Sequence, residues 1–151
     1  MNILSYGGGV NSTAMLIGLH QRNIPVDLIL FADTGGEQPY TYDYLPIMDQ
    51  WLETHGLPKI IIVQYTDQDG NRLTLEEECL RSASLPSIAY GHKTCSLKHK
   101  VAPQEKFCNN HPLCREVWDR GERIVKFIGY DAGEERRRNH AVVYDIQDRK
   151  Y

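Results

Sequence analysis

The chain has 151 residues, of which 41% are hydrophobic and 25% charged, and its formal net charge is −3. This composition is typical of a globular domain with one core, and the length is too short for two ordinary domains. The acidic balance argues against a general nucleic-acid or membrane-surface binder, and no apolar run approaches membrane-spanning length, so we expect no membrane partner.

Apolar runs in the first 65 residues alternate with helix-like patterns. Three short runs predict buried strands, at Asn2–Ser5, Asp27–Ala32 and Lys59–Tyr65. Apolar residues at helical spacing lie between them, over Ser12–Gln21 and Pro39–Thr54. Pro39 suits a first helical turn, whereas Pro46 is expected to kink or break its helix. The alternation predicts an α/β fold with an open, mostly parallel Rossmann-like sheet flanked by helices, in a single domain over residues 1–151.

The second half of the chain is less regular. A short helix is predicted over Thr74–Leu80, with Thr74 and Glu77 forming a capping box. The stretch Ser82–Lys98 is rich in turn residues and basic, and is predicted to be a long ordered loop. The remaining expected elements are a helix at Pro112–Arg120, a strand at Val125–Ile128 and a helix beginning within Ala132–Arg138.

A glycine-rich stretch, Ser5-Tyr6-Gly7-Gly8-Gly9-Val10-Asn11-Ser12, joins the first predicted strand to the first predicted helix. One interpretation is a plain turn in which Asn11 or Ser12 caps the helix. The other is an anion-binding loop, because a helix N-terminus at the carboxyl end of a strand offers unpaired N–H groups and the positive end of a dipole. The stretch is neither a P-loop nor the spaced-glycine dinucleotide fingerprint.

Two further strand ends carry polar residues. Asp33, in "FADTGGEQPYTY", is suited to bind a ribose hydroxyl or a metal ion such as Mg²⁺, and Thr34 and Gly35 follow it in a donor-rich turn. The late stretch "IGYDAGEERRR" carries three arginines that can pair with phosphate or sulfate oxygens. A capped turn and a solvated basic helix end are the structural alternatives for these two stretches.

Taken together, "SYGGGVNST", "FADTGGEQPYTYDYL" and "IGYDAGEERR" resemble the motifs of the phosphoadenylyl-sulfate (PAPS) reductase family. This family belongs to the PP-loop superfamily of adenine-nucleotide enzymes, and the resemblance extends from Ile3 to Arg138. It implies that the chain binds ATP or PAPS and acts in sulfur chemistry. The reaction would be either cleavage of ATP between its α and β phosphates, with adenylylation for sulfur transfer, or reduction of a sulfonucleotide.

The resemblance also implies roles for individual residues. The anion loop would consist of Ser5, Gly7, Gly8, Gly9, Asn11 and Ser12. The residues beside the adenosine would be Asp33, Thr34 and Gly35, and those on the far side of the pocket Gly129, Glu134 and Arg137. The region "KTCSLKHKVAPQEKF" matches the family's Cys-x-x-x-Lys-x-x-Pro region through Cys95, Lys98 or Lys100, and Pro103. Cys95, Lys98 and Arg137 are the predicted catalytic residues.

Three departures from the family pattern bear on the reaction. Asn11 stands where ATP pyrophosphatases carry Asp, which removes a carboxylate that could bind a metal. The sequence to Tyr151 contains no Glu-Cys-Gly-x-His tail, which supplies the nucleophilic Cys in the family's reductases. The Cys-Cys pair and Cys-x-x-Cys of cluster-bearing sulfonucleotide reductases are also missing. Reduction of PAPS would therefore need another thiol, from Cys95 or from a thiol-donor protein.

The N-terminal segment Met1–Leu4 lacks the features of a signal peptide, so we expect a cytoplasmic location with reduced thiols. The four cysteines are Cys79, Cys95, Cys108 and Cys114. They could hold a [4Fe–4S] cluster or Zn²⁺, or they could be separate buried or free thiols. Cys95 lies between Lys93 and Lys98, which favours its thiolate and makes it the best candidate for a sulfur nucleophile. A residue that only packs the loop is the alternative for Cys95.

Other functional classes remain open at this stage. A non-catalytic nucleotide-binding module, or a subunit of a larger complex, would account for the short chain. A nucleic acid as the acceptor is weakly supported by the basic residues around Lys93–Lys106 and Arg136–Arg138. The expected partners are thus an adenine nucleotide, a thiol or other sulfur donor, and a second copy of the chain in a homo-oligomer.

Overall fold

The computed structural model describes residues 1–92, 94–135 and 139. Its centre is a four-stranded sheet in the order β3-β2-β1-β4, in which every neighbouring pair is parallel. The strands are β1 (Asn2–Tyr6), β2 (Leu28–Asp33), β3 (Ile60–Gln64) and β4 (Val125–Ile128). The predicted α/β fold with an open parallel sheet is confirmed, and the predicted strands match to within one residue at most ends.

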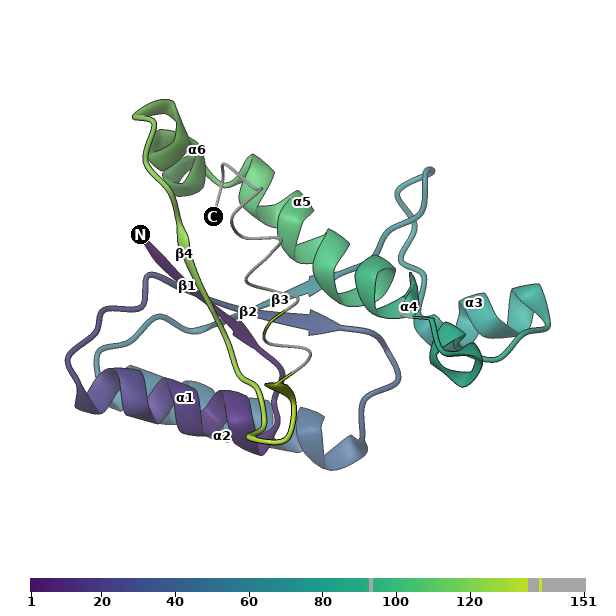
Figure 1. The fold of residues 1–151 in the computed structure, drawn as a ribbon, viewed down its shortest axis with the longest axis horizontal. Coiled ribbons are helices and arrows are strands. Elements are labelled where there is room, and N and C mark those ends of the chain that lie inside the picture. The colour runs from purple at the N-terminus through teal and green to yellow at the C-terminus, as the bar shows by residue number, and fades with distance from the viewer. Residues whose placement is uncertain (93, 136–138, 140–151) are drawn as a thin grey trace.

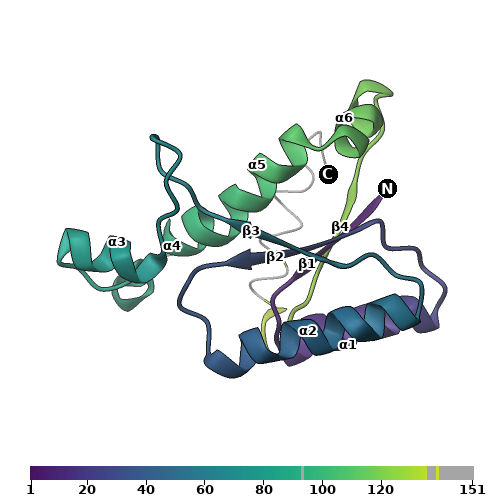
Figure 2. The same cartoon turned by 180° about the vertical axis from the view of Figure 1, so that it is seen from behind.

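Helices cover both faces of this sheet (Figures 1 and 2). On one face lie α1 (Val10–Gln21) and α2 (Pro39–Thr54), and on the other lie α5 (Ala102–Asn110) and α6 (Pro112–Asp119). Beyond the carboxyl ends of β2 and β3 are the short helices α3 (Leu75–Ser82) and α4 (Thr94–Ser96). A 3₁₀ turn, η1 (Ser87–Tyr90), precedes α4, and a π-helical turn, η2 (Leu97–Val101), connects α4 to α5.

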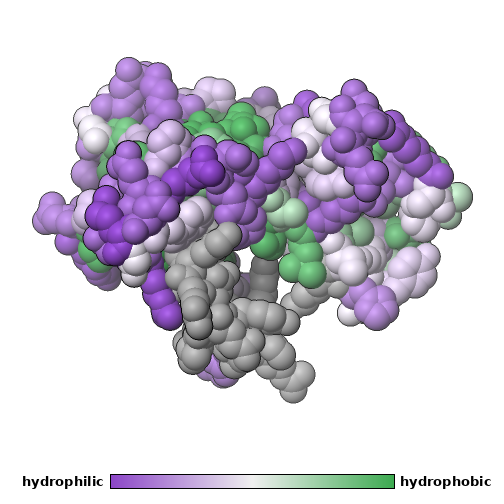
Figure 3. Space-filling view, turned by 90° about the horizontal axis from the view of Figure 1, so that it is seen from above, coloured by the Kyte–Doolittle hydropathy of each residue, from purple (hydrophilic) through white to green (hydrophobic). Residues whose placement is uncertain are grey.

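Two hydrophobic clusters sandwich the sheet because successive strand residues point to opposite faces. On β1, Leu4 faces the α1–α2 layer and Ile3 faces the α5–α6 layer. All six residues of β2 are buried, as expected for a central strand covered on both sides. The outer surface is different: seen from above, it shows mostly hydrophilic side chains with apolar ones in small patches (Figure 3).

The segment between α3 and α6 differs most from the sequence prediction. The expected capping box is confirmed: the Thr74 side chain accepts from the Glu77 N–H, and the Glu77 carboxylate accepts from the Thr74 N–H at 2.8 Å. The expected long loop Ser82–Lys98 is wrong in part, because it contains η1, α4 and the start of η2. A helix was predicted to begin within 132–138: residues 132–134 are not helical, residue 135 is, and residues 136–138 lie outside the described residues. In the part of the chain that the structure describes, no helix is both long and apolar enough to cross a bilayer.

Helix α2 runs from Pro39 to Thr54 without interruption, although Pro46 lies inside it. Of the two expected effects of Pro46, a kink or a break, the break does not occur. Proline lacks the N–H that would bond to the carbonyl of residue 42, four positions earlier. Its neighbours Leu45 and Met48 are buried against the sheet, whereas Pro46 faces solvent. The packing of the neighbouring side chains holds the helix together across the missing hydrogen bond.

Replacing Pro46 by Ala should therefore stabilise the protein. The substitution restores one backbone hydrogen bond and removes the ring clash, and we expect the free energy of unfolding to rise by about 1–3 kcal/mol. Urea unfolding measures this difference. Pro39→Ala is the matched control: Pro39 stands in the first turn, where its N–H would have no intrahelical partner, so we expect no gain. An unchanged or lower stability of Pro46→Ala would contradict this account of α2.

Candidate functional site

The order of the strands creates a topological switch point between β1 and β4. From β1 the chain proceeds through α1 to β2 on one side, and β4 returns to the other side of β1. Ligands of open α/β sheets bind in the crevice beyond the carboxyl ends of the strands at such a point. A cavity of about 780 Å³ lies there, lined by the ends of β1 and β4, the glycine loop, the start of α1, and residues of η2 and α5. We call it the switch-point cavity.

The first turn of α1 presents bare backbone to this cavity. The N-cap residue is Gly9, and among the residues that the structure describes no side-chain hydrogen bond caps the first turn. The first intrahelical bond runs from the Thr13 N–H to the Gly9 carbonyl at 3.1 Å. The Ser12 hydroxyl donates to the same carbonyl at 3.0 Å, so it does not cap the helix. The interpretation in which Asn11 or Ser12 is the N-cap is therefore wrong, and the N–H groups at this helix end are left for another acceptor.

In the glycine loop and the late motif, Gly8 and Gly129 stand where a Cβ would come too close to neighbouring atoms. Gly8 has φ +69°, and a Cβ there would lie 2.6 Å from Thr41 Cγ2. A Cβ on Gly129 would lie 3.0 Å from the Ser12 nitrogen and 3.0 Å from the Asn11 carbonyl carbon. Gly129 follows the last residue of β4, so the late motif and the glycine loop meet backbone to backbone. A Cβ on Gly9 would meet no atom of the described residues within 4 Å, in keeping with an open face toward the cavity.

Two lysines supply positive charge to the cavity lining. Lys100 comes from η2 and pairs with Glu37 at 2.8 Å, and Lys126 comes from β4 and pairs with Glu105 at 3.2 Å. The sequence prediction offered Lys98 or Lys100, and the structure puts Lys100 in the lining. Lys126 was not predicted, although a lysine within the apolar run "VKFI" was the available signal. The side chain of Lys126 is only 14% exposed.

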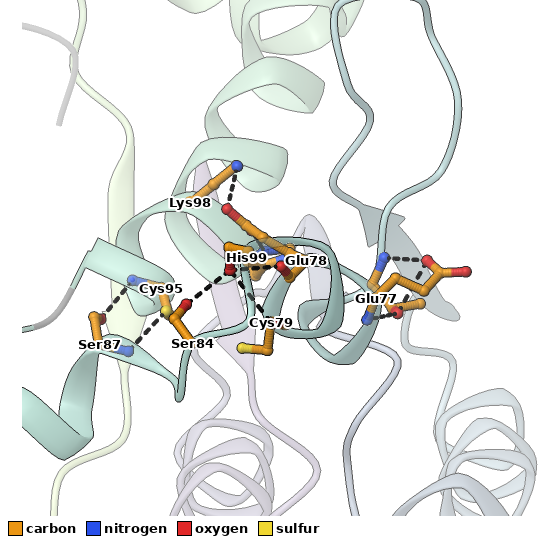
Figure 4. A network of polar contacts seen from close by, with 10 residues as sticks. Glu77, Glu78, Cys79, Ser84, Ser87, Cys95, Lys98 and His99 are labelled. Carbon is orange, nitrogen blue, oxygen red and sulfur yellow. Dashed lines mark hydrogen bonds and ion pairs between the residues drawn. The ribbon is translucent and has the colours of Figure 1, made fainter.

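Lys98 lies outside the switch-point cavity lining and belongs to a separate polar network. Figure 4 shows Glu78 between Lys98 and His99, with contacts of 2.6 Å and 2.5 Å to its two carboxylate oxygens. The hydrogen bond that the Lys98 ammonium donates to Glu78 raises the pKa of Lys98, and burial opposes that shift. The ammonium group also lies 4.7 Å from the centre of the Tyr65 ring. Lys98 therefore helps to fasten η2 to α3 and is not directed at the same ligand as Lys100.

Asp33 is almost completely occupied by protein donors and is not part of the lining. One carboxylate oxygen accepts from the Gly35 N–H at 2.8 Å and the Tyr42 hydroxyl at 2.7 Å. The other accepts from Gln64 at 2.7 Å and from Arg72 at 3.0 Å. Burial raises the pKa of Asp33, but these hydrogen bonds and the Arg72 charge outweigh it and hold the pKa below its usual range. In this arrangement Asp33 ties β2, α2 and β3 together.

The residues after Asp33 complete this turn. The Thr34 hydroxyl donates to Glu37 at 3.2 Å, and Gly35 has φ +74° and lies so close to Thr74 that a Cβ would overlap its side chain. Glu134, from the late motif, lines the cavity and accepts from the Asp131 N–H at 3.1 Å. Arg137 lies outside the described residues. The glycine loop, Gly129 and Glu134 therefore share one site, while Asp33, Thr34 and Gly35 form the adjoining turn.

Cys95 lies next to the cavity rather than in its lining. Its thiol sulfur accepts from the Ser87 N–H at 3.1 Å, and its own N–H donates to the Ser87 hydroxyl at 3.0 Å (Figure 4). The following residues Ser96 and Leu97 do line the cavity. The predicted nucleophile is therefore hydrogen-bonded to η1 and is not among the residues that line the cavity.

The four cysteines fall into two pairs. Cys108 and Cys114 are buried in the core against the α5–α6 face, where burial raises the pKa of Cys114 to about 12. Cys79 is on α3, near Cys95, and burial and the Cys95 thiol raise its pKa. Over the described residues, no group of three or more His, Cys, Asp and Glu side chains is placed to hold a metal ion. The arrangement thus gives no support to the predicted four-cysteine cluster or zinc site.

Gly129→Ala should disturb the site and the fold together. The new Cβ would press on the backbone of Asn11 and Ser12, which cannot move aside without shifting the first turn of α1. We expect the free energy of unfolding to fall by about 1–3 kcal/mol in urea titrations. Gly133→Ala is the matched control, because a Cβ there meets no atom within 4 Å. Equal stabilities of the two variants would contradict the close packing of β4 on α1.

Asp33→Asn tests the hydrogen-bonded carboxylate through pH. Since the folded pKa of Asp33 is lowered, its stabilising contribution is complete above the pKa of the unfolded state and is lost as pH falls through the folded pKa. At pH 7 the Asn variant should be about 1–3 kcal/mol less stable, because an amide presents donors to donors. Urea unfolding at pH 7 and near pH 3 should show the difference shrinking in acid. A difference that is independent of pH would rule out this role.

Neither a scan against protein-family models nor a search of curated proteins gave a match for this chain. The PAPS reductase resemblance therefore remains a prediction from motifs, and the fold and the geometry of the switch-point cavity are the structural support available for a functional proposal.

Proposed function

We propose that the switch-point cavity binds the phosphate or sulfate end of an adenine nucleotide, ATP or PAPS, and that the protein is a PP-loop enzyme of sulfur chemistry. One observation carries this proposal: the uncapped first turn of α1 shares a cavity with Lys100 and Lys126. Backbone N–H groups, a helix dipole and two ammonium groups all favour an anion at the same place.

The size and the lining of the cavity support a nucleotide over a bare ion. A volume of about 780 Å³ is within the usual range for pockets of small-molecule ligands and cofactors. The lining also contains aliphatic side chains that are partly open to solvent, namely Val10, Leu97, Val101 and Ile128. Such side chains suit the faces of a purine base, while the helix end and the lysines suit its phosphates. The cavity therefore has an apolar part and a positively charged part, which match the base and the phosphates of a nucleotide.

Cleavage of ATP is the reaction that these residues support best. An acceptor oxygen would attack the α-phosphorus, the bond to the bridging oxygen would break, and pyrophosphate would leave. The N–H groups of the α1 first turn and the Lys100 ammonium would stabilise the charge that develops on the leaving group. A sulfur nucleophile would then displace AMP from the adenylylated acceptor. Magnesium would enter on the phosphates, and Asp131 and Glu134 are lining carboxylates of the type that suits this ion.

Reduction of PAPS is less well supported by the positions of the thiols. Cys95 hydrogen-bonds to Ser87 outside the lining, so an attack on the ligand's sulfur would need a thiol from a donor protein or a rearrangement of α4. The same observation favours the second candidate function, a non-catalytic nucleotide-binding module. In that case the cavity binds nucleotide and no bond is broken.

The first test is product analysis with purified protein under anaerobic conditions. Incubation with ATP and Mg²⁺ should give AMP and pyrophosphate once an acceptor and a sulfur source are present, and chromatography identifies both. Lys100→Met should weaken ATP binding at least tenfold, about 1.4 kcal/mol, because an ammonium–phosphate contact is lost. Lys59→Met is the matched control, since Lys59 lies outside the cavity lining and pairs only loosely with Glu53 at 3.6 Å.

The other outcomes are distinct. Adenosine 3′,5′-bisphosphate formed from PAPS with a thiol donor would make the protein a reductase. Binding of both nucleotides without turnover would support the module. If neither nucleotide binds, or if Lys59→Met weakens binding as much as Lys100→Met, the proposed site is wrong.

A further inference from the structure

Gln104 is a buried polar residue in the switch-point cavity that the motifs did not single out. It lies in the first turn of α5, lines the cavity and is only 5% exposed. Its carboxamide oxygen Oε1 finds no hydrogen-bond partner among the residues that the structure describes. The Nδ1 atoms of His99 and His111 are also buried and also have no hydrogen-bond partner among the described residues. Neither histidine lines this cavity.

A buried carbonyl oxygen without a partner is unfavourable, and native proteins nearly always satisfy such groups. An apolar side chain of the same length would fill this place in α5 without that penalty. Packing of the core therefore does not account for a glutamine at position 104. A ligand in the cavity would explain it, because the oxygen would gain its hydrogen bond when the ligand binds.

The neighbours of Gln104 indicate which part of a nucleotide it meets. Leu97, Lys100 and Val101 precede it by seven, four and three residues and line the same cavity, so these side chains share one face of the η2–α5 helix. The oxygen is an acceptor, and phosphate and sulfate oxygens are acceptors too, so the two would repel. Its partner is a neutral donor, and the aliphatic Leu97 and Val101 beside it suit the nucleoside end of the ligand.

We propose that Gln104 is a specificity-determining residue whose Oε1 accepts a hydrogen bond from a donor of the bound nucleoside. This inference rests on the proposed function, since it requires a nucleotide in the switch-point cavity. Two groups of an adenine nucleoside supply the required donor: the exocyclic amino group of the base and a hydroxyl group of the ribose. An experiment with matched analogues separates them.

The test is a binding cycle between Gln104→Met and nucleotide analogues. Wild-type protein and variant are titrated by calorimetry with ATP, purine riboside triphosphate (which lacks the amino group), 2′-deoxy-ATP and 3′-deoxy-ATP. We expect ATP to bind the variant about tenfold more weakly than wild type. The analogue that lacks the critical donor should bind wild type about tenfold more weakly than ATP binds wild type. On the variant, this analogue and ATP should bind with equal affinity. That analogue identifies the donor.

A second measurement separates a binding role from a structural one. Without nucleotide, Gln104→Met should have an unfolding midpoint equal to or higher than that of wild type, because it removes an unpaired buried oxygen. A glutamine that serves only the fold would give a lower midpoint. Gln50→Met, on the exposed face of α2, is the matched control and should change neither the affinity nor the midpoint.

The outcomes of this cycle distinguish the two proposals. If wild type binds ATP and the variant binds all four nucleotides with wild-type affinities, the role of Gln104 is wrong while the proposed function stands. If the variant weakens ATP and every analogue by the same factor, Gln104 does not read a nucleoside donor. If wild type binds neither PAPS nor any of these four nucleotides, the proposed function fails, and the role of Gln104 fails with it.

Discussion

The parallel pairing of β4 with β1 determines where the site forms and which residues it contains. The register places Ser5 opposite Ile128, so the two strands end together. The residue after each strand then enters the same crevice: the glycine loop after β1 and Gly129 after β4. Gly129 reaches the backbone of α1 because it has no side chain. Segments more than a hundred residues apart in the sequence thus form one side of the switch-point cavity.

The charges in the cavity are paired before any ligand arrives. Lys100 is held by Glu37 and Lys126 by Glu105, so an incoming anion competes with a carboxylate for each ammonium group. Such pairs hold the lysine side chains in position, and they reduce the net attraction for small ions that offer little other contact. A larger ligand that also uses the helix N-terminus and the aliphatic lining compensates for the lost ion pairs. The arrangement thus favours a ligand with an anionic end and an apolar end.

The sequence predicted the sheet well because buried parallel strands need continuous apolar runs, which "DLILFA" and "KIIIVQY" show clearly. It failed on α5, whose buried residues are Pro103, Gln104 and Cys108, a set without an apolar periodicity. For the site, the glycine loop was visible because turns after strands have a local signature. The hydrogen bonds that Gln64 and Arg72 donate to Asp33 could not be predicted, because these two residues lie 31 and 39 residues further along the chain. Long-range side-chain partners of this kind leave no local pattern.

The hydrogen bonds that converge on Asp33 have a consequence for the glycine loop. They fix the turn after β2 and, through Tyr42, the first turns of α2, where Thr41 packs against Gly8. Asp33 therefore stabilises the glycine loop indirectly, through α2, and needs no contact with a ligand to do so. Ordering a chain of small residues costs conformational entropy. Here that entropy is lost when the protein folds, so a ligand meets a loop that is already ordered, and less of its binding energy is spent on immobilising the loop.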